Sequence, residues 1–73
     1  MTHKYSMIIE WSDADAAFVA TLPEFPSNRT HGATYEEAAR NGQEVLGMLI
    51  DVYRDDGKPL PEPRVLRDPP VLV

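Results

Sequence analysis

The first third of the chain alternates between apolar and polar residues. Every second residue from 5 to 11 is large and apolar, a period that predicts a β-strand with one buried face. Residues 12–16 are turn formers, and residues 17–21 repeat the strand pattern, so the two runs are expected to pair as an antiparallel hairpin. Residues 29–33 predict a short third strand.

A helical period replaces the alternation after Thr34. Thr34 is placed to accept a hydrogen bond from the backbone N–H of Glu37, and Gly57 is a typical residue for ending a helix. These features predict one helix over residues 35–56, about 30 Å long. Apolar or small residues between these two ends form a single stripe: Ala38, Gly42, Val45, Leu46, Leu49, Ile50 and Tyr53.

Prolines interrupt the pattern in two places. Pro23 and Pro26 flank Phe25, so this stretch leaves the sheet, and Phe25 either folds back into the core or contacts a partner. Five of the seven prolines lie in the tail, residues 58–73, where residues 64–66 could add an edge strand.

These elements predict one α+β domain over residues 1–73, with its core at about 4–66. The expected sheet has three or four strands, is rich in antiparallel pairs and carries one long helix on one face. A domain of this size buries only about 60% of its unfolded surface. The chain has no cysteine for disulfides, so we expect support from association with itself or with another chain.

The charge of the chain is concentrated on the predicted helix. The formal net charge is -5, and residues 34–57 contain six acids against two arginines. This sign disfavours direct binding to nucleic acid and favours a basic partner. Partner contacts are therefore expected among acids that could equally form a solvated helix face: Glu36, Glu44, Asp51 and Asp55.

Two groups of residues suggest chemistry. Glu10, Asp13 and Asp15 could gather a divalent cation for a metal-dependent nuclease, or could form a solvated turn. His31 could act as a general acid or base, form a structural hydrogen bond or line an interface. No recognisable motif completes a site around these residues, so we predict no catalytic residue, metal site or cofactor, and His31 joins the partner-binding candidates.

Large aromatic side chains are the remaining strong signal, and most of them are expected in the core because they bury the largest areas. They are Tyr5, Trp11, Phe18, Phe25, Tyr35 and Tyr53. Neither a membrane-spanning segment nor an export signal is recognisable, so we expect a cytoplasmic protein without a membrane partner.

Three motifs together resemble the HicB family over about residues 4–66: LPEFP at 22–26, HGATYEEA at 31–38 and DGKPLPEP at 56–63. The resemblance implies a partial ribonuclease-H-like fold, β-β-β-α-β, whose last strand would lie near residues 64–66. It also implies an antitoxin domain that forms a homo-oligomer, a dimer or tetramer, and that binds and neutralises a small basic HicA-type RNA-cleaving toxin.

No DNA-binding segment is recognisable before Val73, so the expected role is toxin neutralisation without a DNA-binding domain of its own. Two alternatives remain open. The chain could be a stand-alone oligomeric HicB-like protein with an unknown ligand, or a degenerate metal-dependent nuclease.

Overall fold

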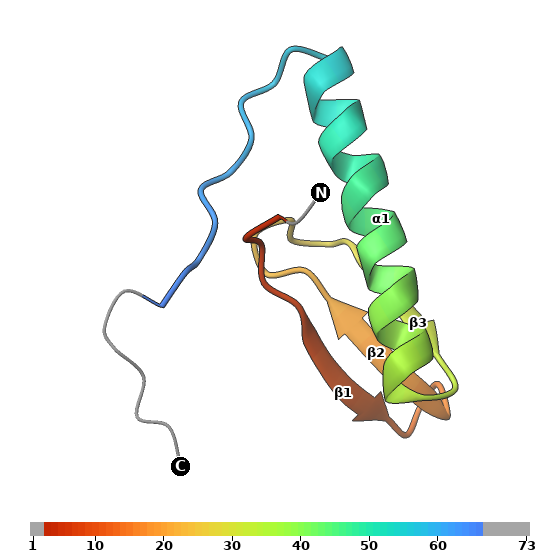
Figure 1. Cartoon of the computed structure of the whole chain (residues 1–73). Coiled ribbons are helices and arrows are strands. Elements are labelled where there is room, and N and C mark those ends of the chain that lie inside the picture. Colours follow the sequence, from red (N-terminus) through yellow and green to blue (C-terminus); the bar gives the residue numbers. More distant parts are fainter. Residues whose placement is uncertain (1–2, 67–73) are drawn as a thin grey trace.

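A three-stranded antiparallel sheet with one long helix on one face forms the fold (Figure 1). The computed structural model describes residues 3–66. Its elements are β1 (Ile8–Ser12), β2 (Ala17–Thr21), β3 (Arg29–Gly32) and α1 (Tyr35–Asp55). The strand order is β1-β2-β3, with β2 paired on both sides. The predicted α+β fold is confirmed, with three strands in the described part of the chain.

The register of the sheet decides which side chains face α1. Ala20 lies opposite Ile9 on β1 and opposite Thr30 on β3, and it is completely buried. A Cβ built on Gly42 would lie 3.4 Å from the Cβ of Ala20 and 2.7 Å from Cε of Met7. The helix therefore approaches the sheet closely at Gly42, where a larger residue would collide with Met7.

Both ends of α1 follow the predicted local chemistry. The hydroxyl of Thr34 accepts a hydrogen bond from the backbone N–H of Glu37 at 3.0 Å. At the other end Gly57 has a φ of +68°, the left-handed conformation that glycine adopts without strain. The helix ends at Asp55, one residue before the predicted end.

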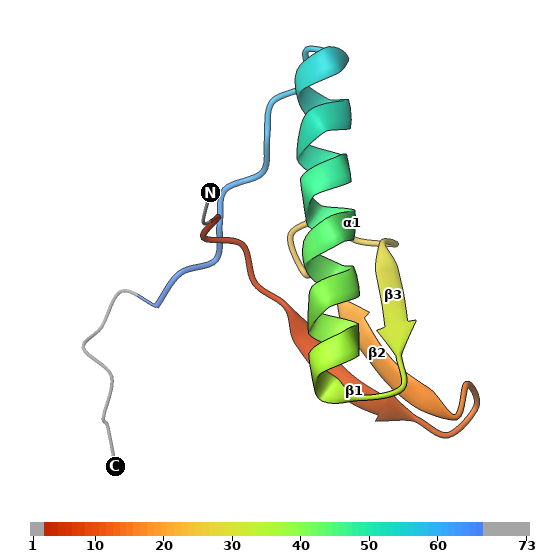
Figure 2. The ribbon, with the colours of Figure 1, turned by 45° about the vertical axis from the view of Figure 1, so that its right-hand side comes forward.

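The C-terminal half of α1 extends beyond the strands (Figure 2). Its apolar stripe is covered there by the loop after β2 rather than by the sheet. Leu22 and Phe25 from this loop form the buried core cluster with Leu46 and Ile50 of the helix.

Phe25 is a core residue. The loop bends because the N–H of Phe25 donates to the carbonyl of Leu22 at 2.9 Å and the N–H of Asn28 donates to the carbonyl of Phe25 at 3.2 Å. The bend turns the Phe25 ring inward, where only 1% of the residue is exposed. The prediction that Phe25 contacts a partner is wrong, since its side chain does not reach the surface.

The expected fourth strand near residues 64–66 is absent from the described residues. Pro59, Pro61 and Pro63 have no backbone N–H to donate to a ladder, and the N–H of Arg64 donates to the side chain of Glu24. The first strand also begins at Ile8 rather than at residue 5. The part of the proline-rich tail from 67 to 73 lies outside the described residues.

Candidate partner-binding surface

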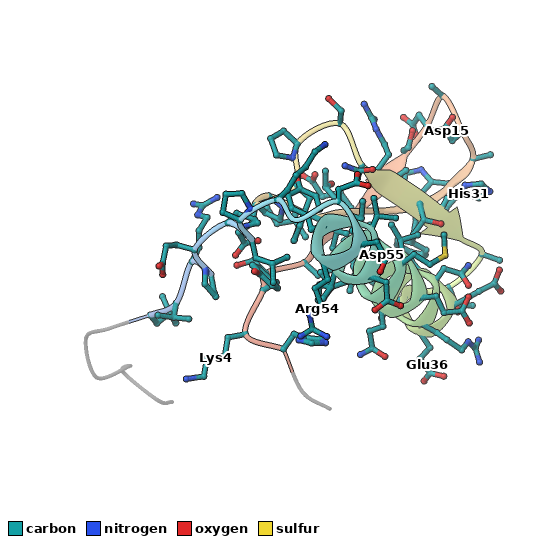
Figure 3. The ribbon with its side chains drawn as sticks, turned by 90° about the horizontal axis from the view of Figure 1, so that it is seen from above. Lys4, Asp15, His31, Glu36, Arg54 and Asp55 are labelled. Carbon is teal, nitrogen blue, oxygen red and sulfur yellow. The ribbon has the colours of Figure 1, made fainter. Side chains whose placement is uncertain are left out.

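Four predicted acids lie on one face of α1. Glu36, Glu44, Asp51 and Asp55 are all exposed, and their spacings of eight, seven and four residues bring them back to one side of a helix. We call these four residues the acidic helix face. Arg40 and Arg54 are exposed on the same side of α1, so four carboxylates and two guanidinium groups share this side. Figure 3 shows Glu36 and Arg54 projecting from the helix into solvent.

His31 lies elsewhere. Gly32 packs against α1, because a Cβ built on it would lie 2.5 Å from the backbone nitrogen of Ala38. Its neighbour His31 therefore points to the opposite face of the sheet, where it is exposed. Figure 3 shows His31 on the same side of the molecule as Asp15 and away from Glu36.

A shallow hollow of about 420 Å³ lies on this open sheet face. Its lining combines opposite charges from Arg29 and Asp15 with Val19, Thr30 and His31. The backbone carbonyl of His31 accepts a hydrogen bond from Nδ2 of Asn41 at 2.8 Å, so the helix side chain caps an edge carbonyl of β3. The structure thus separates His31 from the acidic helix face and does not bring the predicted residues into one site.

The metal-binding interpretation of Glu10, Asp13 and Asp15 has no geometric support. Oδ1 of Asp13 accepts a hydrogen bond from Nε1 of Trp11 at 2.7 Å. Oδ2 of Asp15 accepts a hydrogen bond from the Ser12 hydroxyl at 3.0 Å. Across residues 3–66, no three His, Asp or Glu side chains are placed to hold a metal ion. These bonds match the alternative of a solvated turn.

Two of the six aromatic residues are on the surface. Trp11 is 54% exposed and Tyr35 is 62% exposed, so the expectation that most aromatic residues lie in the core does not extend to these two. Between them lies the partly buried ring of Phe18, 5.1 Å from the Trp11 ring and 4.2 Å from the Tyr35 ring, measured between centroids. We call Trp11, Phe18 and Tyr35 the aromatic row. Its ends lie near the end of β1 and at the first residue of α1.

A carboxylate that the sequence analysis missed ties the tail to the domain. Both oxygens of Glu24 lie 3.1 Å from the backbone nitrogen of Ser6, which donates to them. Oε2 also accepts from the Ser6 hydroxyl at 3.1 Å and from the backbone N–H of Arg64 at 2.8 Å. We call Ser6, Glu24 and Arg64 the Glu24 clamp. Nearby, the hydroxyl of Tyr5 donates to the carbonyl of Pro61 at 2.8 Å.

The Glu24 clamp changes the acidity of two side chains. Partial burial by itself raises the pKa of Glu24, but the hydrogen bonds from Arg64, from its own backbone and from Ser6 outweigh it and leave this pKa below its ordinary value. Burial raises the pKa of Tyr5, and the negative charges of Glu24 and Glu62 add to that rise. The carboxylate therefore stays ionised where it holds the tail.

Comparison of the chain with protein-family models, with curated proteins and with solved structures finds no match. In the described part of the chain, no helix combines the length and the apolar character needed to cross a membrane.

Proposed function

We propose that this chain is a HicB-like antitoxin domain that binds a small basic ribonuclease of the HicA type and masks its RNA-binding surface. The observation that carries the proposal is the acidic helix face. It runs from Glu36 to Asp55, a distance of about 28 Å along the helix axis, on a side of α1 that the sheet does not cover.

The physical reason is competition for positive charge. A small ribonuclease holds the RNA backbone with lysine and arginine side chains. A rigid helix that presents carboxylates over several turns attracts the same side chains, and it speeds association at moderate salt. Bound in this way, the domain would exclude RNA without any catalytic group of its own.

The element order supports the proposal without carrying it. The order β-β-β-α matches the first four elements that the HicB resemblance implies, and the motifs at 22–26 and 31–38 form the loop after β2 and the entry to α1. In this proposal neither cofactor nor metal takes part.

The test is co-purification with a basic HicA-type toxin expressed in the same cells, together with rescue of toxin-arrested growth. The informative variant is Glu44→Gln/Asp51→Asn/Asp55→Asn. Its matched control is Glu10→Gln/Asp15→Asn/Glu62→Gln, which loses the same three charges from exposed positions outside α1. We expect the helix variant to raise Kd about tenfold or more and the control to raise it less than about threefold. Absence of any complex, or equal weakening by both variants, would refute the proposal.

We further propose self-association. Met48 and Val52 lie one helical turn apart on α1 and are 63% and 52% exposed, so this flank of the helix offers apolar area to a second copy. Light scattering at micromolar concentration should give a mass above that of the 8.2 kDa chain. A monomer under those conditions would refute this part.

A further inference from the structure

The aromatic row is a continuous surface feature carried by three elements. Phe18 stands in its centre on β2, with Trp11 of β1 on one side and Tyr35 of α1 on the other. The Trp11 ring meets Phe18 edge-on, at 74° between planes, and more than half of both Trp11 and Tyr35 remains open to solvent. Exposed rings of these two types are the residues most often found at binding hot spots.

The row is held in place before any partner arrives. The indole N–H of Trp11 donates a hydrogen bond to Asp13, and the Tyr35 ring packs on the Phe18 ring at 4.2 Å between centroids. Side chains that already make such contacts lose less freedom on binding. Such a site can therefore bind with a small entropic cost.

A carboxylate lies beside the row. Oδ1 of Asp13 accepts the hydrogen bond from the indole N–H of Trp11, and a second exposed acid, Glu36, lies in the same first turn of α1 as Tyr35. Aromatic faces beside carboxylates match one side chain especially well. An arginine guanidinium is planar and always charged, so it can stack on a ring while its N–H groups donate to a carboxylate. A lysine ammonium is a compact, strongly hydrated charge, so it does not stack on a ring in this way.

We propose that the aromatic row is a docking site for an arginine side chain on the basic protein partner. The identity of that partner rests on the proposed function, whereas the arginine preference rests on the rings and carboxylates alone. Charge decides against a second copy of this chain as the occupant. A symmetric contact through this row would bring Asp13 against Asp13 of the copy, whereas self-association through Met48 and Val52 would leave the row open.

The chain contains its own reporter, because Trp11 is its one tryptophan. The fluorescence of Trp11 is followed while a short peptide of alternating arginine and serine is added, and again with a peptide in which lysine replaces every arginine. We expect saturable quenching by both peptides, with the arginine peptide binding about three- to tenfold more tightly.

Three variants separate stacking from simple charge attraction. Tyr35→Ala and Asp13→Asn should each reduce the preference for arginine over lysine, whereas Tyr35→Phe, which keeps the ring, should retain it. The control Asp51→Asn removes one charge from the far part of α1 and should weaken both peptides equally. Circular dichroism establishes that each variant is folded before its titration is interpreted.

Equal affinity for the two peptides, or no quenching by either, would overturn the inference. A change in Trp11 fluorescence on dilution of the chain alone would also overturn it, because a second copy would then cover the row. These outcomes leave the toxin test unaffected. Growth rescue without an arginine preference refutes only this inference, and an arginine preference without rescue refutes only the proposed function.

Discussion

The molecule contains two groups of three aromatic rings that differ in how far their rings are buried. In one, the ring of Phe25 lies 4.9 Å from Tyr5 and 5.5 Å from Tyr53, all centroid distances, and Phe25 is buried. In the other, the aromatic row, Phe18 is partly buried between two exposed rings. Both groups have a phenylalanine in the centre, so residue type does not distinguish them.

Coverage distinguishes the two groups. The Phe25 group is enclosed by the C-terminal half of α1, the loop after β2 and the N-terminal segment, which the Glu24 clamp joins to the tail. The aromatic row lies at the other end of the helix, and no further segment of residues 3–66 encloses its outer rings. The first group therefore stabilises the fold, and the second is available for binding.

The largest effect is expected from Phe25→Ala. Removal of a fully buried ring leaves a cavity in the small core, so the free energy of unfolding should fall by about 3–5 kcal/mol. Urea unfolding followed by circular dichroism measures the loss. The control is Leu66→Ala at a residue that is 90% exposed, where a change within about 0.5 kcal/mol is expected. Similar effects of the two variants would contradict the burial of the Phe25 group.

The next effect concerns the contact between Gly32 of β3 and the first turn of α1, the turn that begins with Tyr35. In Gly32→Ala the new methyl group would meet the backbone of Glu37 and Ala38, so the first turn of α1 must move away from the sheet. We expect a loss of about 1–3 kcal/mol by the same urea measurement. Gly47→Ala is the matched control. It has open space around the new methyl group and should instead stabilise the helix by up to about 1 kcal/mol.

The Glu24 clamp should make a smaller contribution to the free energy of unfolding, and this contribution should depend on pH. The pKa of Glu24 lies below its ordinary value of 4.5 in the folded chain, so its ionised form stabilises the fold. That contribution is complete above pH 4.5 and is lost as the pH falls through the lower folded pKa. Glu24→Gln should cost about 1–2 kcal/mol at neutral pH.

The measurement is urea unfolding of the chain and of Glu24→Gln at neutral and acid pH. The difference in unfolding free energy between the two proteins should shrink in acid, since protonation removes the same charge that the substitution removes. A difference that stays constant with pH would show that the carboxylate charge does not hold the tail.

The smallest effect on stability is expected at the aromatic row. Tyr35→Ala removes a ring that is 62% exposed, and the free energy of unfolding should fall by less than about 1 kcal/mol. Thermal unfolding measures it. A loss as large as that of Phe25→Ala would place Tyr35 in the stabilising group and contradict the comparison.

Local patterns predicted most of the fold. The range 17–21 of β2 and the first residue of α1 follow from period and capping, because these signals lie within a few residues of each other in sequence. Two features were predicted less well: the residue at which β1 begins, and the fourth strand expected near residues 64–66. Both depend on Glu24, whose partners Ser6 and Arg64 are 18 and 40 residues away, and no local pattern records such contacts.

The candidate surface was predictable only in part. Charge and helical spacing placed the acids of α1 on one exposed face, as observed. Composition could not show that Phe25 is enclosed while Trp11 and Tyr35 are open, because aromatic residues favour cores and binding surfaces alike. That distinction depends on where α1 ends relative to the strands, which is a property of the folded chain.

The most direct test of the two roles is an NMR titration of the 15N-labelled chain with the arginine peptide. The indole N–H of Trp11, which donates to Asp13, gives a separate signal for the aromatic row. We predict that this signal and the amides of Tyr35 and Glu36 move most, while those of Phe25 and Tyr53 stay in place. Largest shifts at His31 and Val19, or an unmoved Trp11 signal, would contradict the account.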